Sequence, residues 1–346
     1  MKTKIGLREV ALEAGVSLST ASHALNGTAP LTNDVRDRVI SCAQRLGYLE
    51  KRRNKASIAS LRAILLAVTG DAAPQSDLNM VSWTVMNGLR QECERRAIRI
   101  IPSISPGSRI DTGEIKRLCQ TEKVDGIVIL NDDRPELIRS LTHLPIPTVL
   151  INGEDPAMLL DTVTAANRFG ARQAIEHLLS LGHRRILHLT WPGRTTIRRR
   201  FDGYLDAFLA ANLPAPTDMV VEAASFEPEE GEKAIRALLA KDPTLKGATA
   251  IFCAADNLAL GCLNALRADG ISVPDDISVM GCDDIMPAEF SSPPLSTVQL
   301  PSARLGAAAI GLMEQRVVSS DALRPAHRLE LGCKLVLRGS IAPPRA

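Results

Sequence analysis

The chain has 346 residues, 45% of them hydrophobic and 23% charged, which is typical of a folded domain protein. Its length predicts two or three domains, and its longest apolar run, 63–68, is far too short to cross a bilayer. Residues 1–62 hold 11 Lys and Arg against 5 Asp and Glu, a net +6, whereas the remainder holds 30 against 34, a net −4. A basic segment ahead of a mildly acidic body is the charge distribution expected of a nucleic-acid-binding protein, because phosphates attract it whatever their sequence.

The composition also bears on cellular location and on cofactors. Seven cysteines are scattered without a CxxC pair or a His-bearing metal spacing, as expected of reduced thiols in a cytosol. No charged segment followed by an apolar run begins the sequence, so no signal peptide is expected. We therefore expect a cytoplasmic protein that contacts no membrane and needs no cofactor or metal.

Residues 7–26 predict two short helices joined by a tight turn. Apolar residues recur at helical spacing from Leu7 to Ala14, and Gly15 then ends the first helix. Ser17 suits the cap of a second helix, in which Ala21 and Ala24 share one face. This is the spacing of a helix-turn-helix motif, whose second helix enters the major groove. A third helix is predicted over 32–46.

Small hydrogen-bonding side chains occupy the opposite face of the second helix. They suit the donors, acceptors and thymine methyls that base edges present in the major groove. The expected contacts are Ser19, Thr20 and His23 to base edges, with Ser17, Ser22 and Asn26 positioning phosphates or capping the helix. The alternative is an ordinary solvated face, because helix pairs with a glycine turn are common.

Residues 7–48 resemble the DNA-binding headpiece of the lactose-repressor (LacI/GalR) family. The matching residues are Val10-Ala11, Ala14-Gly15-Val16-Ser17, Thr20, Ser22, Asn26, Val35-Arg36, Val39 and Leu46-Gly47-Tyr48. A looser resemblance continues to about residue 340. It implies a sequence-specific DNA-binding transcriptional regulator, expected to be a repressor, that acts as a homodimer on a near-palindromic double-stranded operator. Gly6 and Ala21 depart from the residues usual in that family.

In the resembled family, the segment after the headpiece is a hinge helix that wedges a leucine into the minor groove. Here residues 51–55 form a basic tract, and Lys55 is expected to contact phosphates. Ile58 or Leu61 is the candidate for the wedge, since a side chain that unstacks bases needs bulk without charge. Glu50 replaces the usual proline, and by composition alone a solvated linker is the better interpretation.

From Ala63 onward, short apolar runs alternate with amphipathic helices, which indicates parallel βαβ units. The expected strands are 64–68, 98–104, 126–130, 148–151, 185–189, 219–221, 249–253 and 277–280, and the expected helices include 82–96, 167–181, 201–211, 228–239 and 258–268. The resemblance implies a periplasmic-binding-protein-like clamp of two lobes, with 293–311 returning to the first. The predicted fold class is thus α/β, with an all-α headpiece and hinge at 1–62 and a two-lobed domain of parallel βαβ units at 63–346 for effector binding and dimerisation.

Polar residues follow three predicted strands at their carboxyl ends, where open α/β sheets bind ligands. Positions that contact the effector in the resembled family match Arg194, Thr196, Arg200, Phe226 and Asp256. Arg and Asp side chains can bracket hydroxyl groups, and an aromatic ring can cover a sugar or base. A sugar or sugar phosphate is the first expectation and a nucleoside or base the second. The alternative is that Arg200 and Asp256 form a structural ion pair or cap helices.

The competing functional class is an enzyme or a solute-binding protein with an adaptor at its N-terminus. The sequence contains no Gly-rich phosphate loop, HExxH motif, Gly-x-Ser-x-Gly elbow or Cys/His constellation, so no residue is assigned a catalytic role. No heptad repeat follows the last strand, which favours a dimer over a coiled-coil tetramer.

Overall fold

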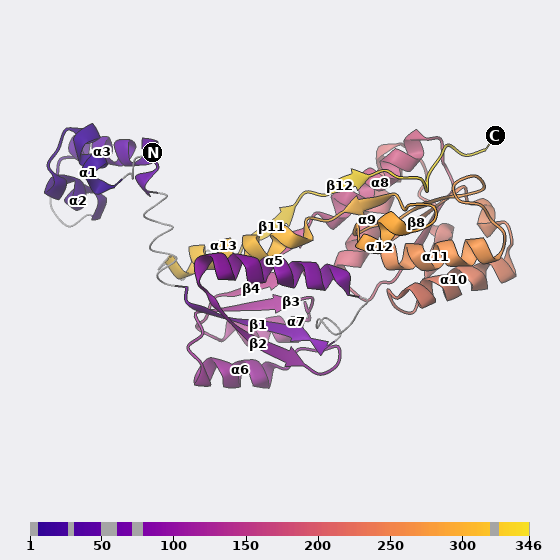
Figure 1. The fold of residues 1–346 in the computed structure, drawn as a ribbon, viewed down its shortest axis with the longest axis horizontal. Coiled ribbons are helices and arrows are strands. Elements are labelled where there is room, and N and C mark those ends of the chain that lie inside the picture. Colours follow the sequence, from indigo (N-terminus) through magenta and orange to yellow (C-terminus); the bar gives the residue numbers. More distant parts are fainter. Residues whose placement is uncertain (1–5, 27–30, 50–60, 71–78, 319–324, 346) are drawn as a thin grey trace. The chain divides into compact units, whose positions relative to one another are not determined.

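The computed structural model describes residues 6–26, 31–49, 61–70, 79–318 and 325–345. It divides the chain into two units, one of residues 1–62 with 314–320 and the other of residues 63–313 with 321–346. The first is helical, and the second is an α/β body of two lobes (Figure 1). The domain limits expected from the sequence, 1–62 and 63–346, stay a prediction.

Three helices make up the helical unit: α1 (Leu7–Ala14), α2 (Leu18–Asn26) and α3 (Asn33–Arg45). Gly15 ends α1 in the left-handed conformation, with φ 63°, which a residue without Cβ adopts at little cost. A salt bridge of 2.7 Å joins Arg45 of α3 to Glu13 of α1. One small core of side chains from all three helices holds the unit together: Val10, Ala11, Ala14, Ala21, Ala24, Val39, Cys42 and Ala43. The predicted helix-turn-helix with its third helix is therefore confirmed.

The first lobe contains a six-stranded parallel sheet in the order β11-β5-β4-β3-β1-β2. Its strands are β1 (Ala63–Thr69), β2 (Arg99–Ser105), β3 (Gly126–Leu130), β4 (Thr148–Ile151), β5 (Asp161–Ala165) and β11 (Arg328–Leu331), and its helices include α5 (Met80–Arg96), α6 (Thr112–Thr121) and α7 (Pro135–Thr142). Every residue of β1, β3 and β4 is buried, which explains why these strands have continuous apolar sequences.

The second lobe contains a four-stranded parallel sheet in the order β7-β6-β8-β9. Its strands are β6 (Ile186–Thr190), β7 (Val220–Glu222), β8 (Ala250–Cys253) and β9 (Ser278–Met280), and its helices are α8 (Asn167–Ser180), α9 (Thr195–Ala210), α10 (Pro228–Lys241), α11 (Asp256–Ala268) and the short α12 (Met286–Phe290). Two 3-10 turns, η2 (Thr217–Met219) and η3 (Leu245–Gly247), connect these elements.

The chain then returns to the first lobe. After β10 (Thr297–Gln299), which pairs antiparallel with β12 (Lys334–Val336), helix α13 (Ser302–Val318) packs on α5. The two helices approach so closely that a Cβ on Gly88 would lie 2.1 Å from the carbonyl oxygen of Ala303. The expected return of 293–311 to the first lobe is confirmed from α13 onward, whereas Leu295, Val298 and Leu300 still pack in the second lobe.

The observed elements match the predicted ones to within two residues at each end, apart from the helix predicted over 201–211. That helix begins at Thr195, so Arg200 lies inside α9 and not at the start of a helix. Strands β5, β10, β11 and β12 were not expected. They are short, and polar or charged residues such as Asp161 and Arg328 interrupt their apolar pattern.

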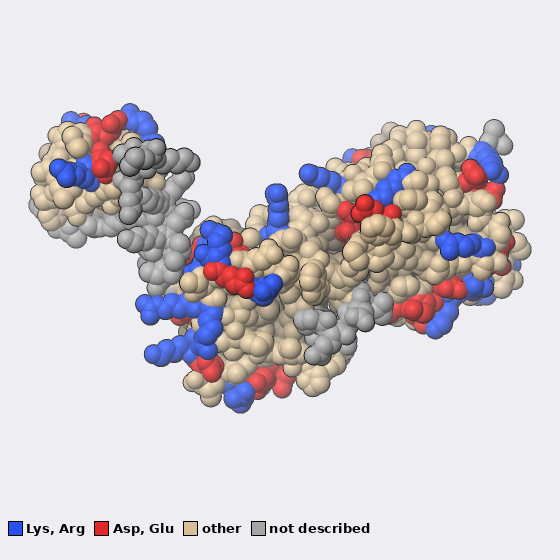
Figure 2. Space-filling model, viewed as in Figure 1, with Lys and Arg blue, Asp and Glu red and all other residues tan. Residues whose placement is uncertain are grey.

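The surface of the body carries charges of both signs side by side over the face seen in Figure 2. Many are helix-surface pairs, such as Arg90 with Glu94 and Arg236 with Glu232, which contribute only a few tenths of a kcal/mol each. In the part of the chain that the structure describes, no helix has the length and apolar character needed to cross a membrane. All seven cysteines are free thiols.

Candidate functional site

The α1–turn–α2 segment presents the predicted DNA-contacting face. Glu9 accepts a hydrogen bond of 2.7 Å from the backbone N–H of Gly6, which satisfies one of the open donors at the start of α1. Ser17 caps α2 by accepting a hydrogen bond of 3.0 Å from the N–H of Thr20. These two caps fix where each helix starts, and therefore which side chains of α2 point outward.

Polar side chains lie on the outer face of α2, as predicted. Ser17, Ser19 and His23 are exposed, whereas Thr20 and Ser22 are half-buried. The Ser17 hydroxyl lies 2.8 Å from the hydroxyls of both Ser19 and Thr20, so the three form one small hydroxyl cluster. Such a cluster can donate and accept, as recognition of base edges requires.

The remaining predicted DNA contacts are Asn26, Lys55, Ile58 and Leu61. Asn26 is the last residue of α2, and its side chain lies outside the described ones. Lys55 and Ile58 also lie outside the described residues. The Leu61 side chain is 1% exposed, so it would have to leave its packed position before it could enter a groove. The choice between Ile58 and Leu61 as the wedge therefore stays open.

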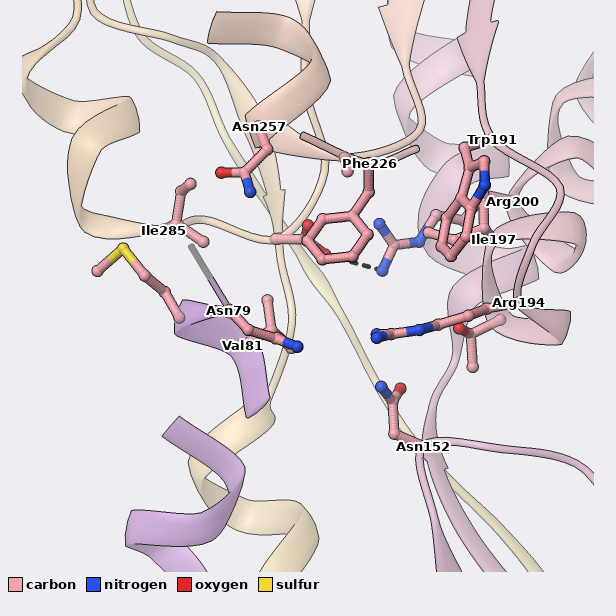
Figure 3. A pocket seen from close by; sticks show the side chains of 14 residues that line it. Asn79, Val81, Asn152, Trp191, Arg194, Ile197, Arg200, Phe226, Asn257 and Ile285 are labelled. Carbon is pink, nitrogen blue, oxygen red and sulfur yellow. Dashed lines mark ion pairs between the residues drawn. The ribbon is translucent and has the colours of Figure 1, made fainter. Parts of the chain in front are cut away.

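The second candidate site is a pocket between the two lobes of the body. It holds about 500 Å³ of empty space, part of it open to solvent. Residues of both lobes converge on it in Figure 3, with Asn79, Val81 and Asn152 on the first-lobe side and Arg194 reaching in from the second. The complete lining is Asn79, Met80, Val81, Asn152, Trp191, Arg194, Thr196, Ile197, Arg200, Phe226, Ala255, Asn257, Asp283 and Ile285.

An aromatic pair and a guanidinium form one side of the pocket. The ring centroids of Trp191 and Phe226 are 5.5 Å apart, with their planes tilted by 51°. The guanidinium carbon of Arg194 lies 5.3 Å from the Phe226 centroid and 6.0 Å from that of Trp191, within the range of cation–π attraction. This side can therefore cover an apolar ligand face while offering donors beside it.

Arg200 lies deeper in the pocket and is held by protein acceptors. Its Nε donates to Asn167 Oδ1 at 3.0 Å, one terminal nitrogen donates to the carbonyl of Ala254, and the other pairs with Asp283 Oδ1 at 2.8 Å (Figure 3). Burial opposes the charge of Arg200, but the adjacent Asp283 carboxylate raises the pKa of the guanidinium above its usual value. Arg200 thus remains a cation whose charge Asp283 already balances.

Asp256 lies behind the pocket lining. It is fully buried, accepts 2.6 Å and 3.0 Å hydrogen bonds from the Thr297 hydroxyl and the Ile285 N–H, and sits against Gly281. Burial, aided by the neighbouring Asp283 carboxylate, raises the pKa of Asp256 to about 7. These contacts make Asp256 structural, although it neither pairs with Arg200, whose partner is Asp283, nor caps α11, while the next residue, Asn257, lines the pocket.

The structure thus brings Arg194, Thr196, Arg200 and Phe226 together at the pocket and leaves Asp256 outside it. Sequence reasoning missed the first-lobe wall. The Asn152 amide donates to Asn131 Oδ1 at 2.6 Å, and the Asn131 amide donates to the Ser82 hydroxyl at 2.7 Å. Both asparagines directly follow predicted apolar strands. Because open α/β sheets bind ligands at the carboxyl ends of their strands, this position could have identified both residues from the sequence.

The sequence matches two known domain families. Residues 6–50 match the family described as bacterial regulatory proteins, lacI family, and residues 175–341 match the periplasmic binding protein-like domain. The HTH-type transcriptional repressor PurR of Mannheimia succiniciproducens is 29% identical over 349 residues, which cover 97% of this chain and 98% of that protein.

Solved structures agree with this assignment. The complex of transcriptional regulator CelR with cellobiose is similar with a TM-score of 0.68 and 27% identity, covering 97% of this chain and all of that one. The Lac repressor dimer bound to operator and the anti-inducer ONPF shares the fold with a TM-score of 0.69 at 21% identity, covering 98% and 100%.

A helix-turn-helix unit joined to a two-lobed α/β body with a pocket between its lobes defines a ligand-responsive DNA-binding transcriptional regulator. The chain combines a lacI-family DNA-binding domain with a periplasmic-binding-protein-like domain, and it is similar over its whole length to repressors of that type. The protein is therefore a regulator and not an enzyme, and the competing enzyme interpretation is wrong.

Proposed function

We propose that the protein is a cytoplasmic transcriptional repressor that binds a near-palindromic operator as a homodimer and changes its operator affinity when a small molecule occupies the interlobe pocket. The observation that carries this proposal is the outward polar face of α2 on a separately packed helix-turn-helix core. Two copies of that face match two half-sites one helical turn apart. Coupling is reciprocal, so operator DNA also changes effector affinity.

On the DNA side, we propose that Ser19, Thr20 and His23 contact base edges, and that Ser17, Ser22 and Asn26 contact phosphates or cap the helix. Lys55 adds a phosphate contact from the basic tract, with Ile58 or Leu61 as the minor-groove wedge. Support comes from the exposure of Ser19 and His23 and from the hydroxyl cluster around Ser17.

On the effector side, we propose Arg194, Thr196, Arg200 and Phe226 as binding residues, with Asp256 holding the wall behind them. Asp283 already balances the charge of Arg200, which favours a neutral ligand over a phosphorylated one. A sugar is supported by the similarity to the cellobiose-bound CelR structure. A nucleoside or base is the second candidate, supported by the Trp191–Phe226 pair and by the full-length similarity to PurR.

Selection of bound duplexes from a library of genomic fragments tests the DNA-binding proposal. Wild-type protein is expected to enrich sequences with two related half-sites, with an affinity that falls steeply between 50 and 200 mM salt, on the order of 10³-fold or more. The double variant Ser19→Ala/His23→Ala should lose that enrichment. Ser41→Ala, an exposed serine on α3, is the matched control and should retain it. Enrichment that is the same for all three proteins would contradict the proposal.

Thermal unfolding in the presence of cellobiose, ribose, adenosine or hypoxanthine separates the two effector classes. A ligand that binds only the folded body raises Tm with concentration. We expect the shift from one class only, and we expect Phe226→Ala to abolish it while leaving Tm without ligand nearly unchanged, since Phe226 is only half-buried.

A further inference from the structure

A second polar cluster lies outside the interlobe pocket and is formed by Glu154, Arg199 and Arg328. Arg199 donates to both carboxylate oxygens of Glu154, through Nε at 2.8 and 3.0 Å and through a terminal nitrogen at 2.7 Å. Arg328 donates to the same two oxygens at 2.8 and 3.1 Å. Glu154 is thus a carboxylate clamped from two sides, with only 3% of its side chain exposed.

Separating the three charged side chains of this cluster is energetically unfavourable. Burial by itself raises the pKa of Glu154, yet the two guanidinium groups hold it below its usual range, so the carboxylate stays ionised. Bidentate Arg–carboxylate pairs are short and geometrically demanding. Breaking the Arg199–Glu154 contact removes three hydrogen bonds from a carboxylate that is 3% exposed and leaves Arg328 as its guanidinium partner, so the separated state is less favourable than the intact cluster.

The cluster connects the two lobes of the body. Glu154 follows β4 and Arg328 begins β11, both in the first lobe, whereas Arg199 belongs to α9 of the second lobe. The Arg199–Glu154 pair therefore crosses from one lobe to the other. Asn152 lines the interlobe pocket two residues before Glu154, and Arg200 lines it one residue after Arg199.

We propose that Glu154 and Arg199 are positioning residues that hold the two lobes at the spacing which forms the interlobe pocket, and that their pair must break when the lobes separate. Arg328 supports the pair by fixing the carboxylate from the first-lobe side. The inference rests on the proposed function, because it assigns the pair a part in effector response, but the pair itself acts in the free protein.

The chain supplies a matched control. Arg168 of α8 makes a bidentate pair with Asp206 of α9, at 2.5 and 2.7 Å, and both residues line one surface hollow together with Glu154, Arg199 and Arg328. Both residues belong to the second lobe, so this pair has the same chemistry and does not cross between lobes. A structural effect common to all Arg–carboxylate pairs would appear in variants of either pair.

The test measures the distance between spin labels introduced as noncanonical amino acids at two exposed positions, Lys116 in the first lobe and Ala240 in the second, in the free full-length protein. Wild-type protein and Arg168→Met should give one narrow distance distribution. Arg199→Met should increase the ratio of longer to native distances at least tenfold, and Glu154→Gln should change it in the same direction. Arg199→Lys should recover only part of the native distribution, because Lys cannot make a bidentate pair.

The inference would be overturned if Arg199→Met and Arg168→Met gave the same distance distribution, whether both remain narrow or both broaden equally. Circular dichroism of each variant establishes that the lobes are folded, and Glu154→Gln retains the shape of the side chain if Arg199→Met fails to fold. Since neither DNA nor effector is present, failure here is distinguishable from failure of the proposed function, which the duplex selection tests separately.

Discussion

Arg200 on α9 and Asp283 after β9 form a buried ion pair at the inner end of the interlobe pocket, 2.8 Å apart, with 4% and 10% of their side chains exposed. The guanidinium also donates to Asn167 and to the carbonyl of Ala254. The Arg200 side chain thus connects α9 to the start of α8, the end of β8 and the loop after β9.

Arg200→Met tests how far the second lobe depends on this pair. The substitution leaves the Asp283 carboxylate buried without its cation, and we expect the free energy of unfolding to fall by about 3–5 kcal/mol. Urea unfolding of the purified protein measures the change. The double variant Arg200→Met/Asp283→Asn should recover most of the loss, and a single variant as stable as wild type would show that the pair is dispensable.

His188 makes the second lobe sensitive to acid. It is fully buried among the rings of Phe201, Tyr204 and Phe252, and burial lowers its pKa to about 4 although its Nδ1 donates to the Phe252 carbonyl. The unfolded chain takes up this proton near pH 6.5 and the folded chain only near pH 4, so this contribution to stability is lost as pH falls through that window. The free energy of unfolding of His188→Phe, measured relative to that of wild type, should therefore rise by roughly 3 kcal/mol as pH falls from 7 to 4. A difference independent of pH would contradict the prediction.

Asp256 has the opposite effect on how stability changes with pH. Burial raises its pKa to about 7, so between pH 7 and the ordinary Asp value near 4 the folded state holds a proton that the unfolded state has released. Its contribution therefore increases stability as pH falls. Asp256→Asn removes this titration, and relative to wild type the variant should become progressively less stable from pH 8 to 5 in the same unfolding experiment. The reverse trend would mean that Asp256 is ionised in the folded protein.

Gly203 permits the close packing of α8 and α9. A Cβ there would lie 2.0 Å from the carbonyl oxygen of Arg168, so a backbone shift is unavoidable. We expect Gly203→Ala to cost about 1–3 kcal/mol despite the better helix propensity of alanine. Gly311→Ala on α13 is the control, since nothing lies within 4 Å of its Cβ position, and it should stabilise the protein by about 0.5–1 kcal/mol. Equal effects at both sites would contradict the packing argument.

The proposed division of labour on DNA is tested by two single variants. His23→Ala should relax base preference at one operator position, at a cost of about 1–3 kcal/mol for the preferred base. Lys55→Ala should instead weaken binding to all sequences alike and reduce the slope of log affinity against log salt by about 1. Competition assays with single-base operator variants at several salt concentrations measure both. A uniform loss in His23→Ala would assign that residue to the backbone.

The helix-turn-helix and most of the parallel strands could be predicted because their sequences carry local signals. Gly15 and Ser17 mark a helix end and a helix start through their own backbone and side-chain chemistry. Buried parallel strands such as β3 and β4 are continuous apolar runs. By contrast, β11 is defined by its pairing with β5, more than 160 residues earlier, which leaves no local trace in the sequence.

The pocket was only half predictable for a related reason. Arg194, Thr196, Arg200 and Phe226 follow recognisable strands in one lobe, whereas the opposite wall depends on how the first lobe is placed against them. Asp256 shows the limit of matching a motif: the Asp-Asn pair is in place at the start of α11, but the Asp turns into the protein and the Asn faces the pocket. Sequence spacing identifies a helix start and does not say which of two adjacent side chains meets the ligand.

Occupation of the interlobe pocket is expected to change the affinity of the protein for operator DNA. The most direct measurement titrates the purified protein onto fluorescent fragments of the region upstream of its own gene at low ionic strength, with and without a panel of sugars, nucleosides and bases. We expect at least one fragment to bind, one compound to change its affinity about tenfold, and Phe226→Ala to remove that change while binding DNA normally without the compound. Protein that binds no fragment, or whose DNA affinity no compound alters, would contradict the account.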